Sequence, residues 1–267
     1  MSELQAYADA FEQTWAGVSS ACTNLTPEQW HSPTDLPGWT VKDNVSHILG
    51  EEKFALGDPA PEHEVPDLPH LRHDFARLIE IPVDLRRPVP GDEVLREFRE
   101  VTARRLAMLR SLPDSALDDE VPGPDGTWQR RRQLGVRVFD CWTHEQDIRR
   151  ALGHPGGLAT SAARISLERV LRSLPGLAED VPAATGRSMA VTTTGAVASA
   201  STLRFDPDRS YVDGAAADAD VRVTVDFATF LRIATGRVPY DAVAAEVAVE
   251  GDVALGEELL RHAAITP

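Results

Sequence analysis

Cysteine is scarce in this chain of 267 residues, which contains only Cys22 and Cys141. Two cysteines do not make a disulfide framework, and both fall in segments that we expect to be helical, where they suit small core positions. No apolar run approaches the length of a membrane span, and no charged-then-apolar leader opens the chain. These absences predict a soluble, cytoplasmic protein.

Positive charge is also in short supply. The 27 Lys and Arg residues stand against 42 Asp and Glu residues, which gives a formal net charge of −15. Nucleic acids and anionic membranes bind proteins through basic surfaces, so we expect neither as a partner. The hydrophobic fraction of 42% supports a real core, and the length suits one large or two small domains.

Residues 134–152 are the most informative stretch and predict one long helix, because they contain no proline and only one glycine near their start. Helical spacing places the apolar residues on one arc, the expected core face: Leu134, Val138, Cys141, Trp142, Ile148 and Leu152. A second stripe contains Asp140, His144 and Asp147. Asp140 and His144 lie one turn apart, so the carboxylate and imidazole can hold one divalent ion. The alternative is that both are structural, with Asp140 neutralising a basic neighbour.

Residues 36–49 predict the start of a second helix that carries a matching histidine. Thr40 is the expected N-cap and Asp43 completes a capping box. The core arc follows as Val41, Val45, Ile48 and Ala55. His47 lies just off this arc, as His144 does on its own helix. Two helices packed core to core would bring both histidines together.

The N-terminal part of the chain predicts a helical bundle. Long helices are expected over residues 3–22, 41–56, 92–111 and 134–152, and bundle interiors commonly build metal sites from facing helices. Residues 57–91 hold seven prolines, which exclude one continuous helix, although a short helix fits between Leu71 and Ile79. Such a connection is often a functional rim or lid. Residues 112–128 are expected to be turn-rich.

Three histidines, His63, His70 and His73, lie in the proline-rich connection. They could form a metal cluster, but their spread across an irregular loop favours solvated side chains.

The composition changes after the glycine-rich stop at residues 153–157. Helices are expected over residues 160–174, 227–235 and from Asp252 onward. Strands are expected over residues 187–194, 201–205, 221–225 and 246–250, the first two as a hairpin. We therefore predict two domains, a bundle over residues 1–154 and a small α+β domain over residues 155–267.

His47, Asp140 and His144 together offer two imidazoles and one carboxylate, which is the donor set of a catalytic divalent site with an open position. An ion in such a site can bind water, a carbonyl oxygen or a thiol, and it lowers the pKa of the group it binds. Spacing alone does not place His47 opposite the helix of residues 134–152.

Two motifs carry a resemblance to a known family. LPGWTVKDNVSHI at residues 36–48, followed by VRVFDCWTHEQDIRRALG at residues 136–153, resembles the mycothiol-dependent maleylpyruvate isomerase family. Residues 226–262 resemble its C-terminal domain. The resemblance implies an α+β protein in which a DinB-like four-helix bundle precedes a small α+β sterol-carrier-like domain.

The resemblance also implies a site and a cosubstrate. Zinc would be held by His47, Asp140 and His144, and mycothiol would be the thiol. The isomerase carries Glu where this chain has Asp140, whose shorter side chain would move the ion closer to the helix or change the metal preference. Arg237 resembles an arginine that holds a substrate or thiol carboxylate, although a lone arginine there is more often a charge at a helix end. Glu51, one turn beyond His47, is a candidate to orient a ligand imidazole or part of a solvated acidic face.

We therefore expect an enzyme that activates a low-molecular-weight thiol for attack on a small-molecule electrophile, as a thiol S-transferase or a cis–trans isomerase. Two alternatives stay open: a non-enzymatic protein that binds a lipid-like ligand, and a hydrolase that uses metal-bound water. The protein is expected to be a monomer or homodimer.

Overall fold

The structure is a computed structural model that describes residues 2–123 and 126–266. The chain forms two compact units that divide between Ala162 and Ala163. The sequence predicted this boundary after residue 154. In the structure, the rest of the glycine-rich segment and the first two residues of the next helix also belong to the bundle unit.

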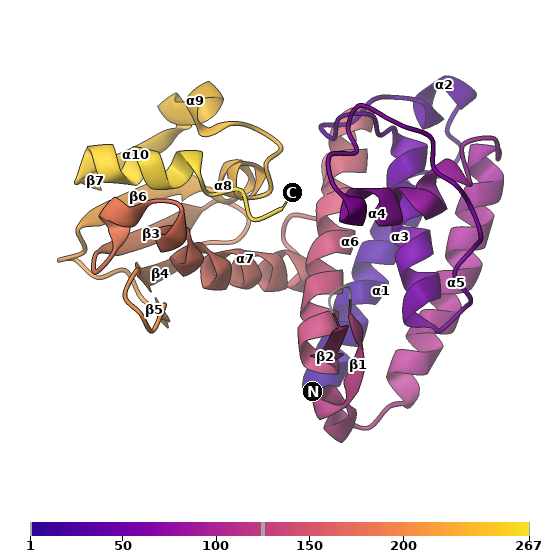
Figure 1. Ribbon diagram of the computed structural model, residues 1–267, viewed down its shortest axis with the longest axis horizontal. Helices are drawn as coiled ribbons and strands as arrows, with labels where there is room; N and C mark the ends of the chain where they lie inside the picture. The colour runs from indigo at the N-terminus through magenta and orange to yellow at the C-terminus, as the bar shows by residue number, and fades with distance from the viewer. Residues whose placement is uncertain (1, 124–125, 267) are drawn as a thin grey trace. The chain divides into compact units, whose positions relative to one another are not determined.

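The first unit is a bundle of four long helices, as predicted (Figure 1). These helices are α1 (Glu3–Ala21), α3 (Val41–Ala55), α5 (Gly91–Ser111) and α6 (Arg130–Leu152). Helix α1 packs against α5 and α6, and α3 packs against the same two helices. Helices α3 and α6 are therefore neighbours, which is the arrangement that the predicted metal site requires.

The helix ends follow the predicted capping signals. Thr26 caps the short helix α2 (Pro27–Trp30). At the start of α3, Thr40 Oγ1 accepts a hydrogen bond from the Asp43 amide at 3.3 Å, and Asp43 Oδ2 accepts one from the Thr40 amide at 2.8 Å. Gly153 ends α6 with a φ of 66°, a conformation that glycine adopts without strain. These caps fix where the site helices begin and end.

Helix α4 (Asp74–Asp84) differs from the expected short helix because it starts later and runs through Pro82. Proline removes the hydrogen bond to the carbonyl of Leu78, but Leu78 is exposed and water can replace that partner. A Cβ added at Gly50 of α3 would lie 2.2 Å from Pro82 Cβ. The glycine therefore lets α4 pack closely on α3.

The segment that was expected to be turns contains a hairpin of β1 (Glu120–Gly123) and β2 (Gly126–Gln129) after a 3-10 turn at Asp114–Asp118. Residues 124–125, in the middle of the predicted turn, lie outside the described residues. Helix α6 follows β2 directly and so begins four residues before the predicted start at residue 134.

The second unit is built on a mixed five-stranded sheet in the order β5-β4-β3-β6-β7. Strand β3 pairs antiparallel with β4 and parallel with β6, and helices α8 and α10 pack against β6 (Figure 1). The α+β class is as predicted, whereas β5 and α9 were not predicted. The elements after the bundle are α7 (Ser161–Ser173), β3 (Ser188–Thr194), β4 (Ser199–Arg204), β5 (Tyr211–Asp213), β6 (Val221–Asp226), α8 (Phe227–Ala234), α9 (Tyr240–Val243), β7 (Val247–Gly251) and α10 (Val253–Arg261).

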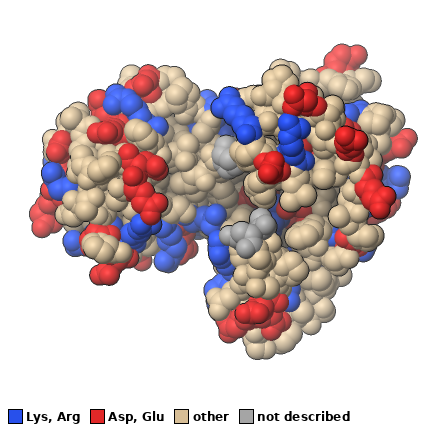
Figure 2. Space-filling model, viewed as in Figure 1, with Lys and Arg blue, Asp and Glu red and all other residues tan. Residues whose placement is uncertain are grey.

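The surface carries charges of both signs. On the face drawn in Figure 2, acidic and basic side chains are interspersed on each unit. None of the helices in the described ranges combines the length and apolar character that a membrane crossing requires.

Candidate metal centre

The middle of α6 is enclosed by the bundle. Every residue from Cys141 to Ile148 is buried, although five of these eight side chains are polar. The sequence analysis placed the polar stripe of α6 beside a single core face, but this part of the helix has no exposed face. Burying polar groups costs free energy unless each finds a partner, so the partners of these side chains show what the interior is built to hold.

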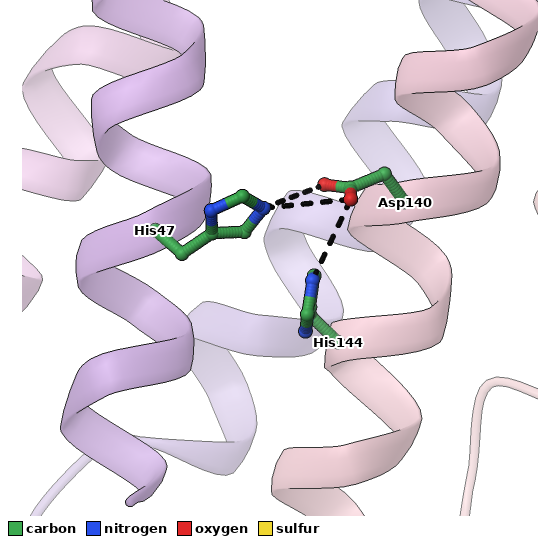
Figure 3. A group of neighbouring side chains, drawn as sticks. All are labelled: His47, Asp140 and His144. Atoms are coloured by element: carbon green, nitrogen blue, oxygen red, sulfur yellow. Dashed lines mark hydrogen bonds and ion pairs between the residues drawn. The ribbon is translucent and has the colours of Figure 1, made fainter. Parts of the chain in front are cut away.

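The predicted ligands meet between α3 and α6 (Figure 3). His47 Nε2 lies 3.2 Å from Asp140 Oδ2, and His144 Nε2 lies 3.5 Å from Asp140 Oδ1. The three donor atoms all lie within 4.8 Å of one another. Bonds of about 2.0–2.1 Å around tetrahedral zinc place neighbouring donor atoms about 3.4 Å apart. The donor set and its spacing therefore fit a divalent ion.

His144 is fixed in the tautomer that a metal requires. The Asn44 amide nitrogen donates to the Thr40 carbonyl at 2.9 Å, which turns Asn44 Oδ1 toward His144 Nδ1 at 2.7 Å. His144 Nδ1 must therefore carry a proton, which leaves Nε2, the nitrogen that faces Asp140, as the one that can bind an ion. Asp147 Oδ2 lies 3.3 Å from the same Nδ1 and also pairs with Arg150.

Trp39 lines the site beside both histidines. Its ring centroid lies 5.1 Å from that of His47 and 5.7 Å from that of His144. The indole N–H donates to Glu80 Oε2 of α4 at 2.9 Å, and the same oxygen lies 3.2 Å from His70 Nε2. Trp39 directly precedes Thr40, the N-cap of α3, and this position beside the capping box was the sequence signal that places its ring near the His47 helix.

Arg137 sets the charge of the carboxylate. Its Nη1 donates to Asp140 Oδ2 at 2.6 Å. Burial alone would raise the pKa of Asp140, but attraction by Arg137, His47 and His144 holds that pKa well below its usual range. For His144, burial lowers the pKa but the nearby Asp140 and Asp147 raise it above its usual value. These charges favour the ionised form of Asp140, which is the form that a divalent ion binds.

Sequence reasoning missed Arg137, although it lies one helical turn before Asp140, where an Asp–Arg pair is an ordinary helix contact. Glu51 lies beside it, with Oε2 3.9 Å from Arg137 Nη1. The role of Glu51 in orienting an imidazole stays a prediction.

Two further residues were considered from the sequence. Cys141 points into the core, as expected, and burial raises the pKa of its thiol well above the usual value. Arg237 belongs to the second unit, where it donates to the Thr235 carbonyl at 2.6 Å and to Thr266 Oγ1 at 3.3 Å. Its role toward a substrate stays a prediction.

The histidines of the proline-rich connection each have a separate partner. His63 Nε2 lies 2.7 Å from Asp84 Oδ2, and His70 pairs with Glu80. His73 caps α4 by accepting from the Ala76 amide at 3.1 Å. These contacts hold α4 in place. Among the described residues, the three histidines do not form a metal-binding cluster.

Solved structures share this fold. Crystal structures of the mycothiol-dependent maleylpyruvate isomerase and of a point mutant of it each give a TM-score of 0.57 at 16% identity, covering 92% of both chains. A sterol carrier protein 2 from Yarrowia lipolytica overlaps 39% of this chain and 94% of its own, with 16% identity and a TM-score of 0.31. That score is below the level at which a shared fold can be argued.

Curated relatives match only part of the chain. An uncharacterized protein found in two strains of Mycobacterium tuberculosis is 22% identical over 142 residues, which are 51% of this chain and 52% of the relative. The chain thus spans about half the length of the curated relatives it matches. The family model of the mycothiol maleylpyruvate isomerase N-terminal domain matches residues 11–149, more than half of the chain. The chain therefore belongs to the mycothiol maleylpyruvate isomerase N-terminal domain family.

Proposed function

We propose that this protein is a metal-dependent enzyme that activates a low-molecular-weight thiol, mycothiol, for attack on a small electrophile. The observation that carries the proposal is the meeting of His47, Asp140 and His144 at distances that suit a divalent ion. The relationship to a mycothiol-dependent isomerase supports the choice of thiol.

Each residue of the site has a distinct task. His47, Asp140 and His144 would hold the ion, which we propose to be zinc. A divalent ion in such a donor set supplies Lewis acidity and lowers the pKa of a thiol or water that binds it. Asn44 keeps the lone pair of His144 Nε2 free for the ion. Trp39 gives the site an apolar aromatic wall that excludes water on that side.

The thiol supports two reactions. In a transferase, the sulfur forms a bond to an activated carbon, the thiol proton is lost, and a halide leaves or an epoxide opens. In an isomerase, the sulfur adds to an activated double bond, the resulting single bond rotates, and elimination restores the double bond and releases the thiol. Substrates of both kinds belong in the test.

Metal content is the first test. We would measure it by mass spectrometry on untagged protein for the wild type, His144→Ala and His154→Ala. His154 is an exposed histidine just beyond the same helix. We expect about one ion per chain in the wild type and in His154→Ala, and none in His144→Ala. A wild type that neither contains nor takes up zinc, nickel or manganese would sink the proposal.

The second test separates the reactions. The zinc-loaded protein is incubated with mycothiol and either a chlorinated electrophile or maleylpyruvate, and a parallel set contains no thiol. Turnover that requires the thiol and is lost in His144→Ala supports the proposal. Hydrolysis without thiol would identify metal-bound water as the nucleophile. Binding of an apolar ligand that Asp140→Ala leaves unchanged, without turnover, would indicate a binding protein.

A further inference from the structure

We propose that Arg137 is a positioning residue of the metal centre, which holds one oxygen of Asp140 so that the carboxylate offers only its other oxygen to the ion. The inference rests on the proposed metal-dependent function and adds a residue to it. It concerns how many positions around the ion stay open for a thiol.

Arg137 is held between two carboxylates. Its Nη1 donates to Asp140 Oδ2 at 2.6 Å, while Nη2 and Nε donate to Glu52 Oε1 at 2.8 and 3.2 Å. The guanidinium is planar and its donors form a rigid fork. An arginine fixed on Glu52 at one edge therefore has one position from which its other edge reaches Asp140.

Glu52 is fixed in turn by a second buried arginine. Its Oε2 accepts from Arg105 Nε at 3.2 Å, and both side chains are fully buried. The charges of Arg105, Glu52, Arg137 and Asp140 alternate along a chain that crosses α5, α3 and α6. Withdrawing Arg137 would take one counter-charge from each of two carboxylates, Glu52 and Asp140, in a region of low dielectric constant, which is costly. Arg137 is therefore locked in place.

Asp140 Oδ1, which Arg137 does not bind, lies near both imidazoles, although Oδ2 lies closer to His47 Nε2, at 3.2 Å. Asp140 Oδ1 lies 3.4 Å from His47 Nε2 and 3.5 Å from His144 Nε2. These nearly equal distances match the spacing of about 3.4 Å between donors around tetrahedral zinc. Oδ2, in contrast, is already bonded to Arg137. One-oxygen ligation leaves a position for the thiol that a two-oxygen carboxylate would fill, and the Arg137 charge favours an anionic ligand there.

Arg137→Lys is the test, with Arg105→Lys as its matched control. Both variants keep the charge but lose guanidinium hydrogen bonds to Glu52, and of the two arginines only Arg137 is bonded to Asp140. We would measure metal affinity by competition with a chelator and coordination number by the visible spectrum of the cobalt-substituted protein. In Arg137→Lys we expect affinity about tenfold or more weaker. We also expect the weaker absorption of five-coordinate cobalt, because Asp140 then binds through both oxygens. Arg105→Lys keeps the wild-type affinity and spectrum while losing stability.

Unchanged affinity and spectrum in Arg137→Lys would overturn the inference, as would equal changes in Arg105→Lys. X-ray absorption at the zinc edge of the wild type gives an answer that does not depend on either variant folding. One carboxylate oxygen at bonding distance supports the inference and two overturn it. If the wild type binds metal through one carboxylate oxygen but shows no thiol chemistry, only the proposed function is contradicted. If the wild type binds no metal, the proposed function and the Arg137 inference are both contradicted.

Discussion

The two units bury different kinds of polar side chain. Among the described residues, the buried polar residues of the α+β unit are all hydroxyls: Ser166, Thr193, Ser201, Thr202, Thr229 and Thr235. The bundle also buries charged residues: Lys42, Asp43, Glu52, Glu80, Arg86, Arg105, Arg137, Glu145 and Asp147. A hydroxyl can bond to a carbonyl of its own helix or strand, whereas a buried charge needs a counter-charge or several hydrogen bonds. The bundle therefore gives up apolar packing to hold charges in fixed positions, and two of these charges, Arg137 and Asp147, contact the candidate metal ligands.

The partners of these charges support that view. Lys42 donates to the carbonyl oxygens of Arg87 and Val89 at 2.7 and 3.0 Å, which ties α3 to the segment before α5. Glu80 receives the Trp39 indole and pairs with His70. The buried charges of the bundle thus join elements that are distant in the sequence. An apolar core would fill the same space without fixing where each side chain lies.

Of the changes considered, we expect Glu52→Ala to have the largest effect, which is a loss of stability in the bundle. This change removes the buried carboxylate that pairs with both Arg105 and Arg137 and leaves Arg137 with Asp140, so we expect the bundle to lose about 3–5 kcal/mol of unfolding free energy. All five tryptophans lie in the bundle: Trp15, Trp30, Trp39, Trp128 and Trp142. Tryptophan fluorescence during urea unfolding therefore reports on this unit. We call the alternating charges of Arg105, Glu52, Arg137 and Asp140 the charge chain. A fluorescence midpoint equal to that of the wild type would show that the charge chain does not stabilise the bundle.

Leu203→Ala is the matching change in the second unit. Leu203 lies on β4 with no exposed surface, so we expect its truncation to cost the α+β unit about 2–5 kcal/mol. Hydrogen exchange followed by mass spectrometry should show faster exchange in peptides of the sheet. The tryptophan transition and the metal content should not change, and a shift in either would mean that the two interiors are energetically coupled.

Asn44→Ala tests whether the polar interior serves the metal. The change removes the acceptor that fixes the His144 tautomer, so we expect metal affinity to fall about 10–100-fold. Ser46→Ala is the control, since this serine is equally buried on α3 and its hydroxyl has no partner among the described residues. Chelator competition measures both variants. Equal affinities would show that Asn44 is only a structural residue.

Asp84→Asn tests whether the contacts of Asp84 with His63 and Arg87 stabilise the fold, through the pH dependence of the unfolding free energy. Burial would raise the pKa of Asp84, but hydrogen bonds from His63 and Arg87 lower it below its usual value. A carboxylate with a lowered folded-state pKa stabilises the fold above its unfolded-state pKa and loses that contribution as the pH falls through the folded-state value. We expect the wild type to exceed Asp84→Asn by about 1 kcal/mol at neutral pH. The difference should shrink as the pH falls below the usual aspartate range and through the lower folded-state pKa, and a pH-independent difference would contradict the assignment.

The smallest expected effect concerns the two thiols, both of which lie in the bundle. Burial raises the pKa of Cys22 to about 12 and that of Cys141 well above its usual value. Neither should react with iodoacetamide at about pH 8 while the bundle is folded. Leu203→Ala should leave both thiols unreactive, whereas Glu52→Ala should expose them at lower urea concentrations. Rapid labelling of the native wild type would show that the bundle opens locally.

Local signals in the sequence were sufficient for much of the fold. The capping box at Thr40 and Asp43 set the start of α3, and Gly153 set the end of α6. The donor residues His47, Asp140 and His144 followed from helical spacing together with the family resemblance. The caps and the Asp140–His144 pair depend on neighbours within a few residues of one another, and such interactions can be read from a single segment, whereas the expectation that His47 joins the pair came from the family resemblance.

The charge chain depends on contacts between helices and was not predicted. Arg105 lies one turn after Val101 and one turn before Leu109 on the buried face of α5, where an apolar residue is the usual choice. The structure buries Arg105 fully and leaves Leu106 partly exposed. The charge of Arg105 is compensated by Glu52, which lies on another helix. A charged residue in the middle of an apolar arc was the available signal.

Helix α6 is the last of the bundle helices to be synthesised, yet it supplies two of the three candidate ligands and Arg137. While the chain grows on the ribosome, α1, α3 and α5 emerge with polar side chains that have no acceptor or counter-charge from α6 to meet them. Closure of the bundle must therefore wait until Leu152 has left the exit tunnel. The order of translation thus makes the candidate metal site the last part of the bundle to be completed.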